Sequence, residues 1–360
     1  PWWRLLPLII GLIGLLDIAP HPHALTHALE RARLQQAQVD PAGAAQALAR
    51  AAERLPNRPE LWEQAGLAAM QGRQTETART YLEQAQAAGA LSPTGLLILG
   101  DAYFQAGAAG EAESTWKAAL AVDVPSEEIY GRLLESARQH GDLDAQLEYM
   151  ETLTSLHPAD GELRYELGLL QAALNPTAAL STLAQAVELQ PERQANTGDL
   201  IRTLRVAALQ ADEAYLQLAA GRGLAAMGEW DLAAAAFRRV VDLQPDYAEG
   251  WAYLGEAYQH LPASVGMGLT TLEHARSLDP DALSTNLLLA LYHQRQGEHQ
   301  TARNFLEHAA QQHPAQPQAW VELGHVLAIL GELEDAYQVY QQAADLAPRE
   351  STYARQIATF

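Results

Sequence analysis

The sequence has 360 residues, with 44 acidic against 23 basic side chains and a formal net charge of −21 at pH 7. Hydrophobic residues make up 48% of the chain, which is enough for a large core and excludes wholesale disorder. The excess of acids argues against a nucleic-acid partner, because such partners require clustered cations. With no cysteine, disulfides and thiolate metal sites are excluded.

The first predicted element is an apolar segment at residues 5–16, preceded by Trp2, Trp3 and Arg4. Counted from residue 2 to residue 19, it approaches the lower limit of about 17 residues for a membrane span. We expect a membrane anchor over residues 1–20, with the bulk of the chain outside the cytoplasm and the cytoplasmic face as the alternative. The anchoring side chains are expected to be Trp2, Trp3, Leu5, Leu8, Ile9, Ile10, Leu12, Ile13, Leu15 and Leu16.

Two other interpretations of the apolar segment remain open, a cleaved signal sequence and an apolar helix packed on the protein or on a partner. Residues 21–58 then predict a linker and a degenerate first helix pair. This region holds His21, His23 and His27, but no carboxylate stands at a companion spacing, so no metal site is predicted.

A repeated pattern dominates residues 59–348. The stretch WAYLGEAY that begins at Trp251 aligns with WVELGHVL at Trp320, 69 residues further on, which is about two periods of 34 residues. In the last unit a turn glycine, Gly331, is followed by Ala336, a large apolar residue, another alanine and a closing proline. This pattern resembles the tetratricopeptide repeat, in which each unit is a pair of amphipathic helices.

The resemblance implies an all-α fold, a superhelical solenoid of helix pairs behind the apolar amino-terminal, expected transmembrane, helix. Four units are expected at 59–191 and four at 214–348, with an inserted helix at 192–213 between them and a capping helix at 349–360. Glycines recur inside first helices, at Gly100, Gly255 and Gly324, where each costs about 1 kcal/mol relative to alanine. We therefore expect the paired helix to approach closely at these positions.

Motifs for chemistry are missing from the sequence: it has no His-Glu-x-x-His, no Gly-x-Ser-x-Gly and no phosphate-binding loop. The expectation is a protein that is not an enzyme and has no cofactor.

The resemblance further implies that first helices line a concave groove in which partner proteins or peptides bind. The Lys and Asn with which some relatives hold a terminal carboxylate are lacking at these positions, and the predicted lining is apolar near its amino half. An apolar peptide or helix is therefore the expected partner. The predicted partner-binding residues are Leu67, Met70, Leu97, Asp101, Phe104, Glu135, Arg138, Tyr165, Arg222 and Glu256.

Charge refines this expectation, because residues 81–131 contain seven acids against Lys117 alone. A partner with a basic stretch beside its apolar one would be attracted there. The alternative is an acidic surface that only keeps the protein soluble. The sequence thus predicts a membrane-tethered scaffold that organises partner proteins. The competing hypothesis is a repeat region or accessory subunit of a larger, transferase-like membrane enzyme complex.

Overall fold

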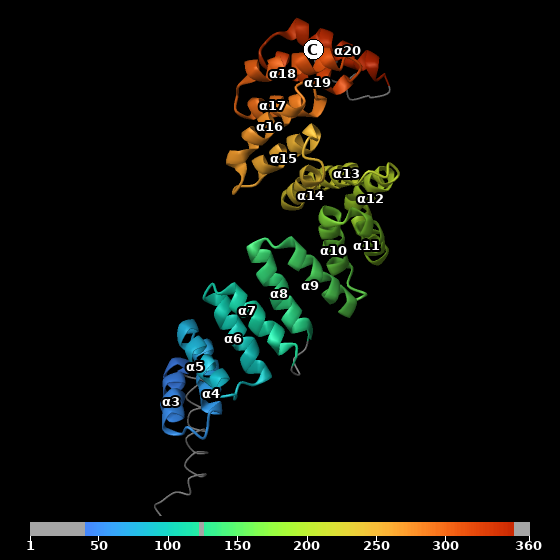
Figure 1. Ribbon diagram of the computed structural model, residues 1–360. Helices are drawn as coiled ribbons and strands as arrows, with labels where there is room; N and C mark the ends of the chain where they lie inside the picture. Colours follow the sequence, from blue (N-terminus) through green and yellow to red (C-terminus); the bar gives the residue numbers. More distant parts are fainter. Residues whose placement is uncertain (1–39, 122–125, 349–360) are drawn as a thin grey trace, which may run out of the picture. The chain divides into compact units, whose positions relative to one another are not determined.

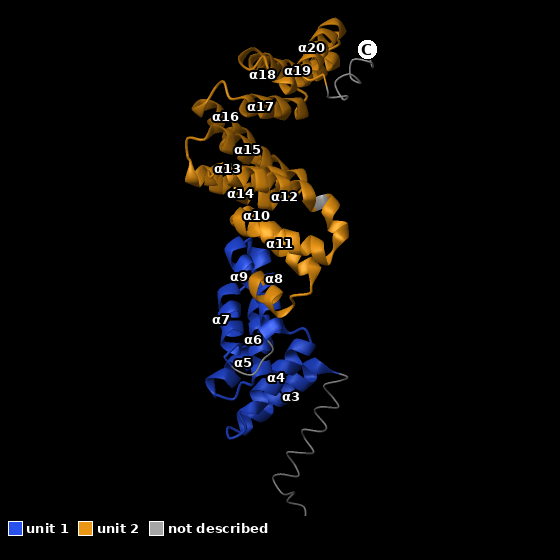
Figure 2. Cartoon of the chain, turned by 90° about the vertical axis from the view of Figure 1, so that its right-hand side faces the viewer, with its two compact units in different colours: residues 1–149 blue, residues 150–360 orange. Residues whose placement is uncertain are grey.

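The computed structural model describes residues 40–121 and 126–348. Within these ranges the regular structure consists of eighteen α-helices, α3 to α20, with two short 3₁₀ turns and no strand (Figure 1). The chain divides into two compact units, Pro1–Tyr149 and Met150–Phe360, whose boundary falls inside α9 (Figure 2). The all-helical fold predicted from the sequence is thereby confirmed for the described residues.

Unit 1 is a succession of helices in which each contacts the next from α3 to α8. Their bounds are α3 (Pro41–Arg54), α4 (Glu60–Gln71), α5 (Thr75–Ala87), α6 (Pro93–Gln105), α7 (Ala109–Ala119), α8 (Ser126–His140) and α9 (Leu143–Leu156).

Unit 2 contains five helix pairs, in which α10 packs on α11, α13 on α14, α15 on α16, α17 on α18 and α19 on α20. The bounds of the first four helices are α10 (Gly161–Leu174), α11 (Pro176–Leu189), α12 (Gln194–Ala208) and α13 (Glu213–Ala226). The remaining helices are α14 (Trp230–Leu243), α15 (Ala248–His260), α16 (Gly268–Leu278), α17 (Leu283–Arg295), α18 (His299–Gln312), α19 (Pro317–Ile329) and α20 (Leu333–Leu346).

Glycine inside the first helix of a pair lets the second helix approach. A Cβ built on Gly324 of α19 would lie 2.6 Å from the ring of Tyr340 on α20. At Gly255 of α15 the obstacle includes backbone, since the carbonyl oxygen of Gly268 would lie 3.0 Å away. Real Cβ contacts are not this short, so the predicted close approach is confirmed at both positions.

The large residues opposite these glycines are buried, as the pattern predicted. Trp116 is 1%, Phe237 1% and Tyr340 2% exposed. Alanines at the same interfaces, such as Ala302 and Ala336, are 0% exposed. At these interfaces a small residue on one helix thus faces a large buried residue on the other.

The inserted segment contains the helix α12, which packs against α11 and α13 and belongs to no pair. Its apolar stripe is buried at Leu200, Ile201 and Leu204, but Leu209 at the end of the stripe is 83% exposed. This helix therefore interrupts the alternation of first and second helices in unit 2.

Several sequence predictions lie outside the described residues. They are the membrane anchor at residues 1–20, the front of the linker up to residue 39, and the capping helix at 349–360. Among the helices of residues 40–121 and 126–348, none combines the length and the apolar character that a membrane span requires.

Candidate partner-binding groove

Unit 2 is hollowed beside the unpaired helix α12. A cavity of about 990 Å³ opens there and is lined by α10, α12, α13 and the turn that follows α13. We call it the α12 cavity. A second hollow of about 570 Å³, the α15 cavity, is lined by α15, α17 and single residues of α13 and α19. Arg222 of α13 lines both, so the two hollows meet at this side chain.

The α12 cavity exists because the pairing pattern breaks. The helix α12 turns Leu200 and Leu204 towards its neighbours, at 2% and 0% exposure, and leaves Val206 57% exposed on the cavity wall. Tyr215 faces the same cavity from α13 and is 39% exposed. Large apolar and aromatic side chains that stay exposed in a concave site are typical of a binding surface.

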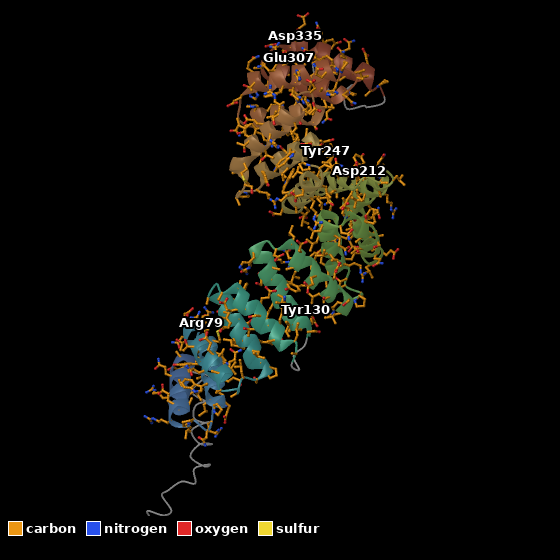
Figure 3. The ribbon with its side chains drawn as sticks, viewed as in Figure 1. Arg79, Tyr130, Asp212, Tyr247, Glu307 and Asp335 are labelled. Carbon is orange, nitrogen blue, oxygen red and sulfur yellow. The ribbon has the colours of Figure 1, made fainter. Side chains whose placement is uncertain are left out.

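The start of α13 is fixed by its cap. Asp212 accepts a hydrogen bond from the backbone N–H of Tyr215 at 3.1 Å, which satisfies one of the free donors at the helix end. The same carboxylate contributes to the environment of Tyr247, which precedes α15 (Figure 3). Burial, and after it the negative charges of Glu249 and Asp212, raise the pKa of Tyr247 well above its ordinary value.

Two exposed arginines, Arg202 and Arg222, line the α12 cavity, and Arg222 is the one that also lines the α15 cavity. Its guanidinium carbon lies 5.2 Å from the centre of the Tyr253 ring, within the range of a cation–π contact. Within the described residues it makes no ion pair with a carboxylate. Burial raises the pKa of Tyr253 despite the opposing effect of Arg222, so the phenol stays neutral beneath the cation.

Tyr165, on α10, forms the opposite wall of the α12 cavity and is 8% exposed. The guanidinium of Arg193 covers its ring, 4.2 Å from the ring centre, and Arg193 is itself ion-paired with Glu162. The ring is thus held in place, and burial raises its pKa. Among the ten predicted partner-binding residues, Tyr165 and Arg222 are the two that the structure brings to this cavity.

Glu256 lies at the same position of α15 as Arg222 does of α13, directly after the helix glycine. Unlike Arg222 it is 7% exposed and held within the fold. Its Oε1 accepts from Arg295 Nη2 at 2.7 Å, and its Oε2 accepts from Arg295 Nη1 at 3.0 Å. Its carboxylate joins α15 to α17, and whether a partner contacts Glu256 stays a prediction.

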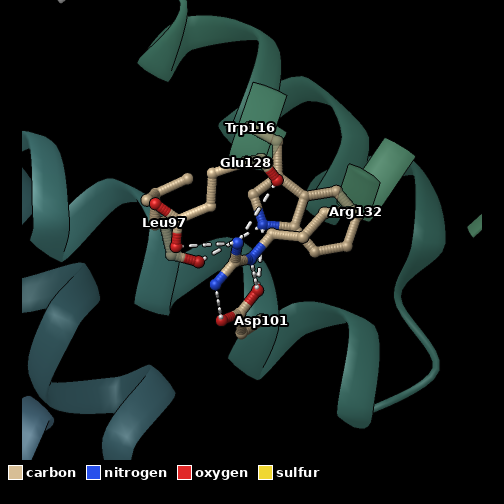
Figure 4. A network of polar contacts seen from close by, with 5 residues as sticks. All are labelled: Leu97, Asp101, Trp116, Glu128 and Arg132. Carbon is tan, nitrogen blue, oxygen red and sulfur yellow. Dashed lines mark hydrogen bonds and ion pairs between the residues drawn. The ribbon is translucent and has the colours of Figure 1, made fainter. Parts of the chain in front are cut away.

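Asp101 in unit 1 is engaged in the same way (Figure 4). It accepts from Arg132 Nε at 2.6 Å and Nη2 at 3.1 Å, and from Trp116 Nε1 at 3.2 Å. The carbonyl of Leu97 also accepts from Trp116 Nε1 at 3.2 Å, and the Leu97 side chain is 5% exposed. Asp101, Trp116 and Arg132 thus join α6, α7 and α8, and whether a partner contacts Leu97 or Asp101 stays a prediction.

The other predicted residues of unit 1 lie at or near the surface. Leu67, Met70 and Phe104 are half-buried, and the Phe104 ring centre is 5.6 Å from that of Trp116. Glu135 and Arg138 are exposed on α8. Whether a partner contacts these five residues stays a prediction.

The acidic stretch at residues 81–131 is less negative than its composition suggests. Arg79 and Arg132, just outside that window, pair with Glu83 and Glu128 at 3.7 and 3.0 Å. Inside it, Lys117 pairs with Glu113 at 2.7 Å, and this hydrogen bond is the main reason that the pKa of Glu113 is lowered. Because the count over residues 81–131 leaves out these two arginines, it overstates the negative charge that would attract a basic partner.

Sequence reasoning missed Val206, Tyr215 and Met227, which line the α12 cavity. The inserted segment did signal a break in the repeats, and Val206 stands off its buried stripe. The sequence therefore indicated that the repeats are interrupted here. It could not show that α10 and α13 form the other walls of a cavity around Val206.

Comparison with known proteins identifies the repeated pattern. The tetratricopeptide repeat family matches residues 63–128, 218–263 and 287–351. No curated protein matches the chain.

Solved structures resemble the chain at low identity. A thermophilic TPR protein of Thermus thermophilus has 20% identity and a TM-score of 0.39, over 55% of this chain and 97% of that one. The C-terminal part of a repeat protein from Cytophaga hutchinsonii has 16% identity and a TM-score of 0.37, over 71% and 97% of the two chains. A tetratricopeptide repeat protein of Parabacteroides merdae has 15% identity and a TM-score of 0.35, over 75% and 99%.

The family match falls on the helix pairs described above, in both units, and agrees with the resemblance seen in the sequence. Such repeats imply a scaffold for protein–protein interaction. The chain therefore contains tetratricopeptide repeats and has the fold of an interaction scaffold.

Proposed function

We propose that this protein is a non-enzymatic scaffold, held at a membrane by its apolar amino-terminal segment, that binds a partner protein in the groove of unit 2. The observation that carries the proposal is the α12 cavity, with exposed Val206 and Tyr215 on its walls and the unpaired Arg222 at its junction with the α15 cavity. A concave site that combines exposed apolar side chains with charged ones suits a partner segment that brings both kinds of side chain.

The polar groups of the two cavities are suited to binding a partner segment. Asp199 and Arg202 are ion-paired with each other on α12, and burial raises the pKa values of Tyr165 in the α12 cavity and Tyr253 in the α15 cavity. Both phenols therefore keep their proton at neutral pH and can donate it in a hydrogen bond. These groups are suited to hydrogen bonding and stacking.

The amino-terminal sequence supports the tether. Trp2 and Trp3 stand where interfacial anchors belong, ahead of the apolar run at residues 5–16. The test is to compare the full chain with a variant lacking residues 1–20 in membrane fractionation. Loss of membrane association in the truncated variant is expected, and unchanged association would refute the tether.

The groove is tested by a pull-down from native membranes with mass spectrometry, using two matched variants of α12. Val206→Glu places a charge on the cavity wall, whereas Leu209→Glu places one three residues away, outside the cavity. Both side chains are exposed, so both variants should fold, which circular dichroism checks. Partners lost with the first variant and kept with the second support the groove; equal capture by both refutes it.

Leu97→Glu is unsuitable as a test of partner binding, because Leu97 is 5% exposed and a charge at this buried position would disturb the fold of unit 1.

A further inference from the structure

We propose that the segment bound in the groove of unit 2 places a basic side chain, Lys or Arg, in the α15 cavity. Its charge faces three carboxylates of that cavity, and its methylene groups pack on apolar side chains of α17. The inference rests on the proposed function and specifies which side chain the partner brings to this part of the groove.

Three carboxylates line the α15 cavity and come from separate parts of the chain. Asp246 precedes α15, Glu249 lies in the first turn of α15, and Asp279 follows α16. None of the three is ion-paired with a residue of 40–121 or 126–348. Glu249 accepts a hydrogen bond from the Tyr247 hydroxyl at 3.2 Å, and Asp279 accepts one from the backbone N–H of Asp281 at 3.0 Å. Both of these donors are neutral, so the negative charges stay available to a cation.

Unpaired acids are common in a chain with a net charge of −21, so the place of these three matters more than their number. In the α15 cavity three carboxylates stand against one guanidinium, that of Arg222, which leaves the lining with a net charge of −2. The lining of the α12 cavity has two acids, Asp199 and Glu229, against two arginines, and is neutral overall. A cationic side chain is therefore favoured in the α15 cavity over the α12 cavity.

The negative charge acts on the tyrosines of the same cavity. Burial, and after it the charge of Glu249, raise the pKa of Tyr247. Burial also raises the pKa of Tyr253, one turn after Glu249 on α15; Arg222 opposes this change and Glu249 adds to it. A potential that opposes a further negative charge on these phenols favours a positive charge placed beside them.

The apolar part of the cavity fits the stem of a long basic side chain. Leu283 and Leu287 are one turn apart on α17, and both are half-buried, as are Leu288 and Tyr253. Lys and Arg lay their methylene groups along such a surface and keep the charged head in water at the rim. A bare metal ion would leave these walls unused, and within the part of the chain that the structure describes no group of three His, Asp or Glu side chains could hold one. The hollow of about 570 Å³ has room for one such basic side chain.

The two cavities meet at Arg222, so one partner segment can lie across both. Its basic side chain then enters the α15 cavity, while a neighbouring apolar side chain contacts Val206 and Tyr215, which are exposed in the α12 cavity. The partner segment therefore combines a basic and an apolar side chain within a few residues.

The test selects random dodecapeptides displayed on phage against the purified full chain in detergent. Enriched peptides are expected to carry Lys or Arg within a few residues of Leu, Ile or Phe. Their synthetic, labelled forms are titrated by fluorescence anisotropy, and their affinity should fall as the salt concentration rises. A triple variant that combines Asp246→Asn, Glu249→Gln and Asp279→Asn should bind them about tenfold more weakly. Asp242→Asn is the matched control, because Asp242 is exposed on α14 and lines neither cavity.

Arg222→Gln should change the affinity in the opposite direction. It removes the positive charge from the lining of the α15 cavity, so the same peptides should bind about threefold more tightly. Peptides in which Lys or Arg is replaced by Glu should lose their binding to the wild type. Circular dichroism checks that the variants fold, and the amides of the triple variant keep an acceptor for the Tyr247 hydroxyl and for the backbone N–H of Asp281.

Enrichment of peptides without a basic residue, equal affinity of the triple variant and the wild type, weaker binding by Arg222→Gln, or failure to select any peptide would each overturn the inference. An equal loss of affinity in Asp242→Asn and the triple variant would overturn it as well, because the attraction would then come from the net charge and not from the cavity. If partner capture from membranes still depends on Val206 in these cases, the proposed scaffold function stands and only the assigned chemistry fails. If capture does not depend on Val206, the groove fails too.

Discussion

Asp101 in unit 1 and Arg222 in unit 2 stand at the same position of their repeats, after Gly100 and Gly221. They differ in charge and in the contacts of their side chains. Asp101 is bound by Arg132 and Trp116 and closes the junction of α6, α7 and α8. Arg222 makes no ion pair with any residue of 40–121 or 126–348, and it lies over Tyr253 at the meeting of two cavities. The comparison teaches that the residue type at one position of the repeat decides whether the side chain is held by an ion pair to the next first helix or stays exposed.

The largest expected effect comes from removing the ring at the closed junction. Trp116→Ala should lower the free energy of unfolding by about 3–5 kcal/mol, because the side chain is 1% exposed and its loss leaves a cavity and removes the hydrogen bonds of its Nε1 to Leu97 and Asp101. Urea denaturation followed by circular dichroism measures the change. Trp62→Ala is the control, since that ring is only half-buried. An equal loss of unfolding free energy in the two variants would show that Trp116 contributes no more to stability than a half-buried tryptophan.

The next prediction tests the two positions directly. Asp101→Asn should cost about 1–3 kcal/mol, because it removes the charge that satisfies the half-buried Arg132. Arg222→Gln should change the free energy of unfolding by less than about 0.5 kcal/mol, because the side chain is exposed and unpaired. Urea denaturation of both variants measures the two changes in the free energy of unfolding. A similar cost at both positions would erase the difference between the closed and the open junction.

A smaller effect is expected at the helix glycines. Gly100→Ala should destabilise by about 1–2 kcal/mol, because the new methyl group overlaps the Trp116 ring and this outweighs the gain in helix propensity. Gly110→Ala should be neutral or stabilising, since no atom lies within 4 Å of its Cβ position. Thermal unfolding compares the two. In the Trp116→Ala background the cost of Gly100→Ala should disappear, because the overlapping ring is gone.

The smallest effect is a dependence on pH. Burial and the charge of Glu322 raise the pKa of Tyr340 to about 12. The neutral phenol is thus favoured in the folded state, so its contribution to stability is complete below about pH 10 and is lost as the pH rises towards 12. Tyr340→Phe should remove this part of the alkaline loss, seen as a smaller drop in the urea midpoint between about pH 9 and pH 11.5. An unchanged drop would assign the loss to other tyrosines.

The sequence predicted the helix pairs well because their cause is local. The glycine of a first helix and the large residue it faces are 16 residues apart in Gly100–Trp116, Gly221–Phe237 and Gly324–Tyr340. A fixed spacing within one hairpin can be read from one chain. The extra helix α12 was also visible, as an apolar stripe outside the pattern.

The exposure and the ion pairs of the predicted groove residues could not be read from the sequence, because they depend on which charges meet across different helices. The repeat placed Leu97, Asp101 and Glu256 in the groove as it placed Arg222. It did not contain the ion pairs of Asp101 with Arg132 and of Glu256 with Arg295, across 31 and 39 residues. Exposure is likewise a property of several helices, and Leu97 at 5% differs from Val206 at 57% for that reason.

The sequence by itself therefore determined the all-helical repeats, their small-to-large packing and the place where they are interrupted, because periodicity and spacing act within one helix pair. The tertiary structure decided that α12 leaves a hollow beside α10 and α13 and that Arg222 forms no ion pair within the part of the chain that the structure describes. Both depend on which side chains from separate helices come within contact distance, and only packing settles that.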